Sequence, residues 1–243
     1  MTRKFVCLLF LAGVMTAVGN VETAQAQKKA QAQKKAQAPK KAARVRSVAT
    51  GDAESKAILN KLSKNYRGMK SMQALVSLEL QGGPGQVKEK RKGKLFLRGK
   101  QYRIDMGEQL IICDGRSSWT YLKELNEVNI SRHEPSPDQI TPDNLFTMYE
   151  KGFDSFLESE TGSGQQGTSC IDLIPQNKSV SYFKVRLFVD RQRNLIQKAI
   201  VFDKSGVQYT YQITEFKVNP KLQDNLFVFN VKAYPNVEVV DMR

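Results

Sequence analysis

The sequence predicts one large antiparallel β-sheet that is curved by glycines and covered on one face by helices. Apolar side chains recur at every second position along most of the chain from Ser71 onward, which is the spacing of half-buried strands. These segments follow one another through turns rich in glycine, proline and aspartate, as consecutive antiparallel strands do. Only two segments have helical spacing. We therefore expect about ten or eleven strands and two helical interludes, in one domain that spans residues 49–243.

The residues before this domain show no pattern of a folded segment. Residues 1–26 have the three parts of a secretory signal: a basic start at Arg3 and Lys4, an apolar run from Phe5 to Val18, and the small-residue site Ala24-Gln25-Ala26. The apolar run is too short to span a bilayer comfortably. The signal therefore predicts that the mature chain is exported.

Residues 27–48 repeat a Gln-Lys-Lys-Ala-Gln-Ala unit, which offers almost nothing to bury. We expect a disordered, lysine-rich tether there. Its two interpretations are attraction to an anionic surface of the cell envelope and a solvated linker without a specific use. The tether carries much of the formal net charge of +14. Since an exported chain does not meet nucleic acid in its normal work, this charge does not indicate a nucleic-acid-binding protein.

The first folded element predicted is a helix that begins after Asp52. Aspartate is a favoured N-cap residue. Ile58, Leu62, Tyr66 and Met69 then recur three or four residues apart, which gives the helix one apolar face.

The spacing changes to two in the next segment, where Ala74, Val76, Leu78 and Leu80 share one face of a predicted strand. Gly82-Gly83-Pro84-Gly85 turns the chain into a second strand, which is basic from Lys88 to Lys94 and apolar from Leu95 to Leu97, with Gly99 at a corner or bulge. Four more strands are expected at Tyr102–Met106, Leu110–Cys113, Trp119–Leu122 and Glu127–Arg132, with Asp114-Gly115 as a hairpin turn.

Thr141 and Pro142 have the order of an N-cap and a first helical turn, and they predict a second helix. Its apolar residues are Leu145, Phe146, Met148, Tyr149, Phe153 and Phe156. The remaining strands are expected at Cys170–Ile174, Val180–Val189, Ile196–Phe202, Val207–Val218 and Leu226–Val231.

The predicted strands are unusually apolar. One face of the strand after Ser181 holds Phe183, Val185, Leu187 and Val189, and the other still holds Tyr182 and Phe188. Two interpretations remain open: a filled core beneath the helices, or a sheet-and-helix sandwich that opens to admit an apolar ligand.

Few residues suggest other chemistry. Cys113 and Cys170 either form a disulfide, as cysteine pairs in exported proteins often do, or are two buried thiols on strands that never meet. His133, the single histidine, lies in a polar loop beside Pro135, and we expect it in solvent. The sequence has no nucleophile elbow, P-loop, zinc-ligand spacing or dinucleotide fingerprint. We therefore expect no enzymatic activity, no metal and no cofactor.

Several short motifs, taken in their order along the chain, resemble the periplasmic outer-membrane lipoprotein carrier family of the LolA type. They are Gly93–Arg98, Tyr102–Ile104, Asp114-Gly115 with Trp119 and Tyr121, Pro142 with its apolar helix, Ile171–Pro175, Val185–Asp190, Ile200–Asp203 with Gly206, Phe227–Phe229, and Val237–Asp241. The resemblance covers essentially the whole folded part, from Ser55 to Asp241. It implies an open half-barrel of antiparallel strands, closed by helices around an apolar cavity.

The resemblance also implies a function: a monomeric carrier in the periplasm. Such a carrier would accept acylated lipoproteins from an inner-membrane ABC exporter of the LolCDE type and deliver them to an outer-membrane acceptor. An arginine that latches a lid over the cavity is expected at Arg98, with Arg103 as the alternative. The residues expected to bind lipid are Leu62, Leu97, Tyr102, Ile104, Trp119, Phe146, Met148 and Tyr149. The alternative function is a periplasmic lipid- or lipoprotein-sensing module of the same fold that signals to a membrane partner.

Overall fold

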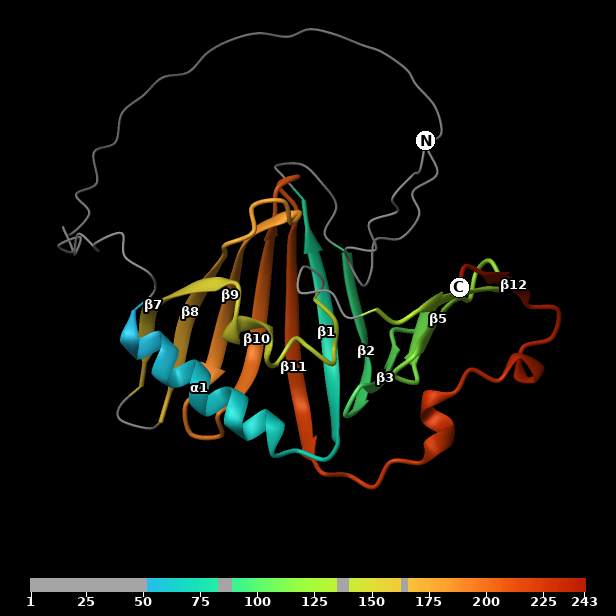
Figure 1. The fold of residues 1–243 in the computed structure, drawn as a ribbon, viewed down its shortest axis with the longest axis horizontal. Coiled ribbons are helices and arrows are strands. Elements are labelled where there is room, and N and C mark those ends of the chain that lie inside the picture. The colour runs from blue at the N-terminus through green and yellow to red at the C-terminus, as the bar shows by residue number, and fades with distance from the viewer. Residues whose placement is uncertain (1–51, 83–88, 135–139, 163–165) are drawn as a thin grey trace, which may run out of the picture.

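The structure, a computed structural model, describes residues 52–82, 89–134, 140–162 and 166–243. The predicted signal and tether lie outside the described residues. Twelve strands form one curved sheet (Figure 1), in the order β12-β6-β5-β4-β3-β2-β1-β11-β10-β9-β8-β7. The antiparallel sheet predicted from the period-two spacing is confirmed, and it is open, with β12 and β7 at its two edges.

The strands form two consecutive meanders that meet at the middle of the sheet. The first comprises β1 (Met72–Gln81), β2 (Glu89–Arg98), β3 (Gln101–Asp105), β4 (Gln109–Cys113), β5 (Ser117–Leu122) and β6 (Glu127–Arg132). The second comprises β7 (Phe153–Thr161), β8 (Thr168–Pro175), β9 (Tyr182–Asp190), β10 (Leu195–Asp203) and β11 (Gln208–Val218). Antiparallel pairing of β1 with β11 joins them, with Leu78 opposite Tyr211. The short strand β12 (Glu238–Asp241) pairs with β6 in parallel.

The predicted first helix is α1 (Ala53–Arg67), and it lies across one face of the second meander (Figure 1). Asp52 caps it as expected, because its Oδ1 accepts a hydrogen bond of 2.6 Å from the backbone N–H of Ser55. The other oxygen of the same carboxylate accepts a hydrogen bond of 2.6 Å from the backbone N–H of Leu157 in β7. One side chain therefore both starts the helix and joins it to the edge of the sheet.

The main core lies between α1 and the covered face of the sheet. Leu59, Leu62 and Tyr66 of the helix belong to one cluster of buried residues with the alternate positions Val185, Leu187 and Val189 of β9 and Ala199 and Val201 of β10. We call this the inner face of the sheet. Because side chains alternate along a strand, the residues between them lie on the opposite, outer face.

The second predicted helix is wrong beyond its first turns. Residues 141–147 form turns, a short 3-10 helix η1 (Met148–Glu150) follows, and Phe153 and Phe156 belong to strand β7. The chain changes structure at Gly152, whose φ of +80° is a conformation that side chains other than glycine rarely adopt. The apolar residues that suggested one long helix therefore belong to two elements, the turns with η1 before Gly152 and strand β7 after it.

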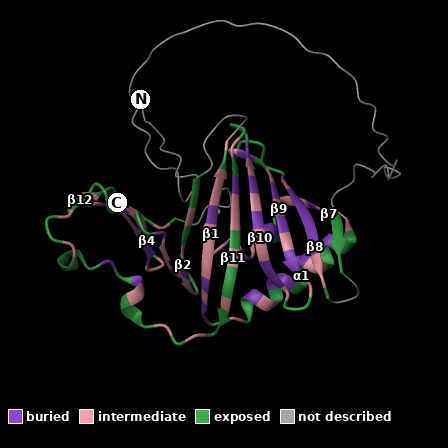
Figure 2. Ribbon diagram, turned by 180° about the vertical axis from the view of Figure 1, so that it is seen from behind, coloured by how far each residue is buried: buried purple, intermediate pink, exposed green. Residues whose placement is uncertain are grey.

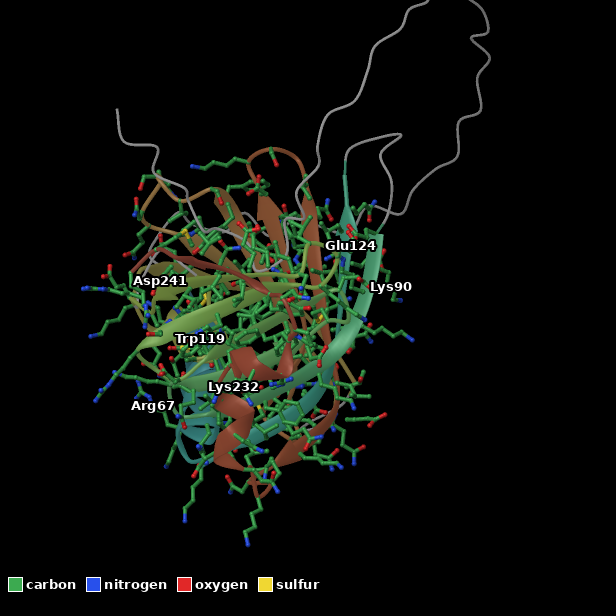
Figure 3. All side chains as sticks on the ribbon, turned by 90° about the vertical axis from the view of Figure 1, so that its right-hand side faces the viewer. Arg67, Lys90, Trp119, Glu124, Lys232 and Asp241 are labelled. Carbon is green, nitrogen blue, oxygen red and sulfur yellow. The ribbon has the colours of Figure 1, made fainter. Side chains whose placement is uncertain are left out.

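The predicted strand Leu226–Val231 is also wrong. Two 3-10 helices stand in its place, η2 (Asp224–Phe227) and η3 (Val231–Ala233). Phe227 and Phe229 are buried two positions apart, which imitates strand spacing, but they pack as separate anchors. Phe229 joins a second apolar cluster on the outer face with Leu110, Ile112 and Val128. The C-terminal segment therefore covers the outer face of β4, β5 and β6, on the side that faces the viewer in Figure 3.

Of the two alternatives for the cysteines, the structure has two free, buried thiols. Cys113 ends β4 and Cys170 lies in β8, and six strands separate β4 from β8 in the sheet. A disulfide needs Cα atoms within about 7 Å, so no bridge joins these positions. The sequence could not decide between the two alternatives, because chain distance gives no indication of sheet order.

Burial raises the pKa of the Cys113 thiol to about 11 and also raises the pKa of Cys170. Since the thiolate is the reactive form, we expect iodoacetamide at neutral pH to modify neither cysteine of the folded mature chain. Denaturation without a reductant should expose both to alkylation, which mass spectrometry measures directly. Uptake of the label only after reduction would contradict the free-thiol assignment.

Candidate apolar ligand site

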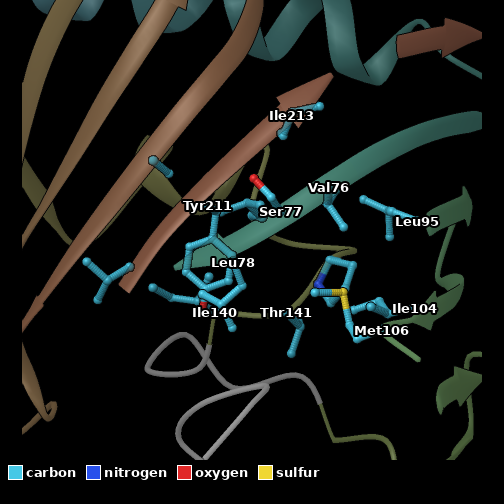
Figure 4. A pocket seen from close by; sticks show the side chains of 14 residues that line it. Val76, Ser77, Leu78, Leu95, Ile104, Met106, Ile140, Thr141, Tyr211 and Ile213 are labelled. Atoms are coloured by element: carbon cyan, nitrogen blue, oxygen red, sulfur yellow. The ribbon is translucent and has the colours of Figure 1, made fainter. Parts of the chain in front are cut away.

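A cavity lies between the inner face of the sheet and the segment that follows residue 139 (Figure 4). Its volume is about 90 Å³. The sheet contributes residues from β1, β2, β3, β10 and β11, and the other wall comes from Ile140 to Leu145. The lining residues are Val76, Ser77, Leu78, Leu95, Ile104, Met106, Ile140, Thr141, Pro142, Leu145, Ala199, Val201, Tyr211 and Ile213.

The lining is almost entirely aliphatic because it is made of the inward-facing positions of five strands. Leu78 on β1, Leu95 on β2 and Ala199 on β10 are buried. Gly93 makes room for Met106, since a Cβ at position 93 would lie 2.5 Å from the Met106 sulfur. Burial raises the pKa of the Tyr211 hydroxyl, which belongs to the same wall. Such a site favours a ligand with alkyl groups and gives an ionic ligand nothing to pair with.

The covering segment comprises residues 140–150. Its turns are held by hydrogen bonds of 2.7 Å from the Leu145 N–H to the Thr141 carbonyl and from the Met148 N–H to the Asn144 carbonyl. The Asn144 side chain in turn accepts a hydrogen bond of 2.8 Å from the Thr141 N–H. The segment is thus a compact, locally bonded unit rather than an extended loop.

One end of the covering segment is attached to helix α1. The Phe146 ring stacks on Tyr66, with ring centroids 4.2 Å apart. The Tyr66 hydroxyl accepts a hydrogen bond of 2.9 Å from the Ile196 N–H, which fixes the ring beneath it. Glu150 forms an ion pair with Arg67 at the end of the helix.

The other end is attached to the first meander through His133, which was expected in solvent. His133 is instead buried, and its Nε2 lies 3.1 Å from Oδ2 of Asp143. The two side chains are only 6% and 9% exposed. The imidazole also packs edge-on against Tyr102, with ring centroids 5.8 Å apart. The expectation failed because Asp143, ten residues away, comes back to meet the end of β6.

The structure brings only part of the predicted lipid-binding set to the cavity. Ile104 lines it. Leu62, Phe146 and Tyr149 are buried in the adjoining core, and Leu97 and Met148 pack against that core. Tyr102 packs with Ile111 and Cys113. Trp119 packs in the outer-face cluster with Leu110, Ile112 and Val128, so it lies on the side of the sheet away from the cavity.

The predicted lipid-binding residues do not include most of the residues that line the cavity, such as Val76, Leu78, Leu95, Met106 and Ile213. Their signal was in the sequence, since Val76 and Leu78 belong to an alternating stripe. The alternating pattern does not indicate which part of a continuous apolar face lines a cavity.

The arginine expected as a latch lies on the outer face. Leu95 and Leu97 belong to the inner side, so alternation along β2 turns Arg98 outward. Its guanidinium forms an ion pair of 2.7 Å with Asp224 and lies 4.7 Å from the centre of the Phe227 ring. The alternative, Arg103, lies in β3 opposite Phe96 of β2, on that same outer side. Arg98 thus holds the C-terminal segment and does not contact the covering segment.

Among the residues that the structure describes, no group of three or more histidine, cysteine, aspartate or glutamate side chains is arranged to hold a metal ion. Within the same ranges, no helix has the length and apolar character needed to cross a membrane.

An open, strongly curved sheet with an apolar cavity beneath a locally bonded cover defines a half-barrel protein that binds apolar ligands. The chain belongs to the LolA family, because the family model described as "Outer membrane lipoprotein carrier protein LolA" matches residues 67–230. The carriers of this family are binding proteins, and lipoprotein carriage is the function that the family as a whole indicates.

Individual relatives are distant. An outer-membrane lipoprotein carrier protein from Xylella fastidiosa is 26% identical over 192 residues, which covers 75% of this chain and 87% of the relative. The corresponding protein from Legionella pneumophila is 25% identical over 155 residues, or 63% and 71% of the two chains. A solved structure of an uncharacterized conserved protein from Thermus thermophilus has a TM-score of 0.51 and 16% identity, and covers 77% of this chain and 99% of that chain. This last similarity concerns the fold alone.

Proposed function

We propose that this chain is a periplasmic carrier that binds the acyl chains of lipoproteins released from the inner membrane and delivers them to the outer membrane. The proposal rests chiefly on one observation, an aliphatic cavity closed by a separate segment in a member of the LolA family. The expected donor is an inner-membrane ABC exporter, and the expected recipient is an outer-membrane acceptor.

The physical need for such a carrier is clear. Each methylene of an acyl chain costs about 0.8 kcal/mol to expose to water, so a lipoprotein anchor does not diffuse freely between membranes. A site of aliphatic side chains lowers this cost without directional bonds. It therefore suits cargoes that differ in their protein part and share only the lipid anchor.

The cavity of about 90 Å³ is smaller than ligand sites of roughly 300–1,000 Å³. We therefore infer that this is a closed form with too little room for an acyl chain, and that cargo displaces the covering segment. Leu145 and Ile140 would leave the sheet, and the aliphatic residues of β1 and β11 would contact the acyl chains in their place. Two contacts hold the covering segment in place, Phe146 with Tyr66 and Asp143 with His133. Their strength then determines how readily the site opens.

Filling the cavity should weaken cargo binding at least tenfold without unfolding the protein. Ala199 is 2% exposed and lines the cavity, so in Ala199→Phe a ring occupies the space meant for an acyl chain. We expect at least a tenfold loss of affinity for a fluorescent diacylglyceryl peptide, while the stability changes by no more than about 1–3 kcal/mol. Titration by fluorescence and thermal unfolding measure the two effects.

Ala233→Phe is the matched control, since it adds the same ring at an exposed position of the C-terminal segment. It should bind the peptide as the unchanged protein does. If Ala199→Phe also bound it normally, the acyl chains would lie elsewhere. If depletion of the protein in its host left lipoproteins correctly distributed between the two membranes, the carrier function itself would be wrong.

A further inference from the structure

Within the residues that the structure describes, no segment covers the outer face of the central strands. Helix α1 lies on the inner side, and the C-terminal segment covers the outer side of β4 to β6 and reaches β3 and the Arg98 end of β2. Figure 2 shows strands β1, β11, β10 and β9 from behind; β1 has intermediate positions between its buried ones, and β11 is intermediate or exposed except at Tyr209. We call the outward side of β2, β1, β11, β10 and β9 the outer basic face.

A row of lysines forms one margin of this face. Lys90, Lys92 and Lys94 are exposed and alternate along β2 with Arg91, Gly93 and the buried Leu95. Two-residue steps along a strand place them about 7 Å apart on the same side. Figure 3 shows Lys90 at the margin of the molecule, on the outward side of β2. Among the residues that the structure describes, no ion pair is formed by any of the three.

The lysine row borders a shallow trough in the outer face. The trough has a volume of about 560 Å³, and it is lined by Lys90, Lys92 and Lys94 together with polar residues of β1 and β11, among them Ser77, Gln212 and Thr214. Two carboxylates lie nearby: Glu215 lines the trough, and Glu79 stands opposite Lys90 in the register of β1 and β2. The three lysines outnumber the two carboxylates, and Lys198 in strand β10, which pairs with β11, adds another positive charge. This part of the outer face is therefore positively charged.

Aromatic side chains accompany the cations farther along the same face. The Lys198 ammonium lies 3.9 Å from the centre of the Phe188 ring, and that of Lys184 lies 4.4 Å from the centre of Phe202. Phe183, which packs beside Phe202, is 51% exposed. Lys184 and Arg186 both pair with Asp172, so the charge there is partly neutralised. A broad face thus combines ammonium groups that form no ion pair with a described residue and rings that are partly exposed.

We propose that the outer basic face docks on a membrane surface that contains anionic lipid headgroups. Charge complementarity supports this occupant, because a flat row of separated ammonium groups matches a plane of many phosphates, and partly exposed rings suit the boundary between headgroups and acyl chains. The covering segment lies on the opposite side of the sheet. Docking through the outer face therefore leaves the cavity free to open, and it does not depend on what the cavity binds.

Binding of the mature chain to vesicles tests the proposal. We expect it to sediment with vesicles of phosphatidylcholine and phosphatidylglycerol and not with phosphatidylcholine alone, and we expect salt to weaken the binding. Replacing Lys90, Lys92 and Lys94 together with glutamate should lower the affinity by at least roughly 100-fold, since each lysine near an anionic surface contributes roughly fivefold. Thermal unfolding and binding of the acyl peptide should stay unchanged, because the three side chains are exposed.

The matched control replaces Lys61, Lys64 and Lys151 with glutamate. These lysines are also exposed, and they lie on helix α1 or directly after the covering segment, so net charge changes equally while the outer face is intact. The control should lose only a few-fold in affinity. Equal losses in the two variants would overturn the proposal and assign the effect to net charge or to the N-terminal lysines. It would also be overturned if neither vesicle bound while polyglutamate bound the lysine row, which would indicate an acidic protein as the occupant.

Discussion

Replacing Phe227 with alanine is expected to destabilise the protein by about 3–5 kcal/mol. The Phe227 side chain is 0% exposed, although it belongs to a short 3-10 helix outside the sheet. Its ring also lies beneath the guanidinium of Arg98. Truncation leaves a cavity under that cation and removes the main apolar anchor between β11 and the second apolar cluster. The free energy of unfolding, measured in urea by circular dichroism, gives the cost.

The ion pair between Arg98 and Asp224 cannot compensate for this loss. The Asp224 side chain is 92% exposed, and pairs in solvent contribute about 0–1 kcal/mol. Val228→Ala provides the control, since Val228 is the next residue and is 55% exposed. It should change stability by no more than about 0.5 kcal/mol. If Phe227→Ala cost as little as Val228→Ala, the C-terminal segment would not unfold together with the sheet.

The fold was largely predictable because strand spacing is a local property. The alternation of Ala74, Val76 and Leu78 is enough to predict β1, and Asp52 in front of an apolar three-and-four pattern is enough to predict α1. The failures arise where local spacing is ambiguous. Phe227 and Phe229 have the period of a strand, yet two 3-10 helices form there, and the edge of β6 pairs with β12 instead.

The apolar character of the candidate site could be predicted from the sequence, but most of its lining residues could not. Apolar strands alone left a filled core and an apolar cavity both open, and the family resemblance implied the cavity. Its position depends on where the covering segment crosses the sheet. Ile104 was predicted because its strand could be recognised, whereas Leu145 lines the cavity through a turn that was expected to be a long helix. The outward direction of Arg98 could have been derived from Leu95 and Leu97, since neighbouring positions of a strand alternate.

The contact between His133 and Asp143 was not predictable, because it depends on the path of the chain between two elements. It matters for the proposed function because it is a buried attachment of the cover to the sheet. Oδ1 of Asp143 has no hydrogen-bond partner among the described residues, so Oδ2 makes the contact that offsets burial of this carboxylate. The Arg67–Glu150 pair at the other end is more exposed, with the Arg67 side chain 64% accessible. The two attachments should therefore differ in strength.

Replacing Asp143 with alanine is expected to favour the open form of the site. It leaves the buried imidazole of His133 without its partner, which costs the closed form about 1–3 kcal/mol and shifts the closed-to-open ratio roughly 5- to 150-fold. Uptake of the fluorescent diacylglyceryl peptide should become faster, and the amides of Leu145 and Met148, which bond within the cover, should exchange hydrogen faster. Stopped-flow fluorescence and hydrogen exchange measure these two effects.

Two variants make the interpretation specific. Glu150→Ala removes the exposed pair and should change uptake only slightly, because such pairs contribute about 0–1 kcal/mol. Arg98→Ala should leave uptake unchanged, since Arg98 contacts the C-terminal segment on the outer face. Faster uptake in Arg98→Ala would instead support the arginine latch that the family resemblance implies. Asp143→Ala could instead leave peptide uptake and hydrogen exchange unchanged and lower only the global stability. The buried pair would then stabilise the fold and not hold the covering segment, because only a contact between that segment and the sheet can alter opening without unfolding the rest.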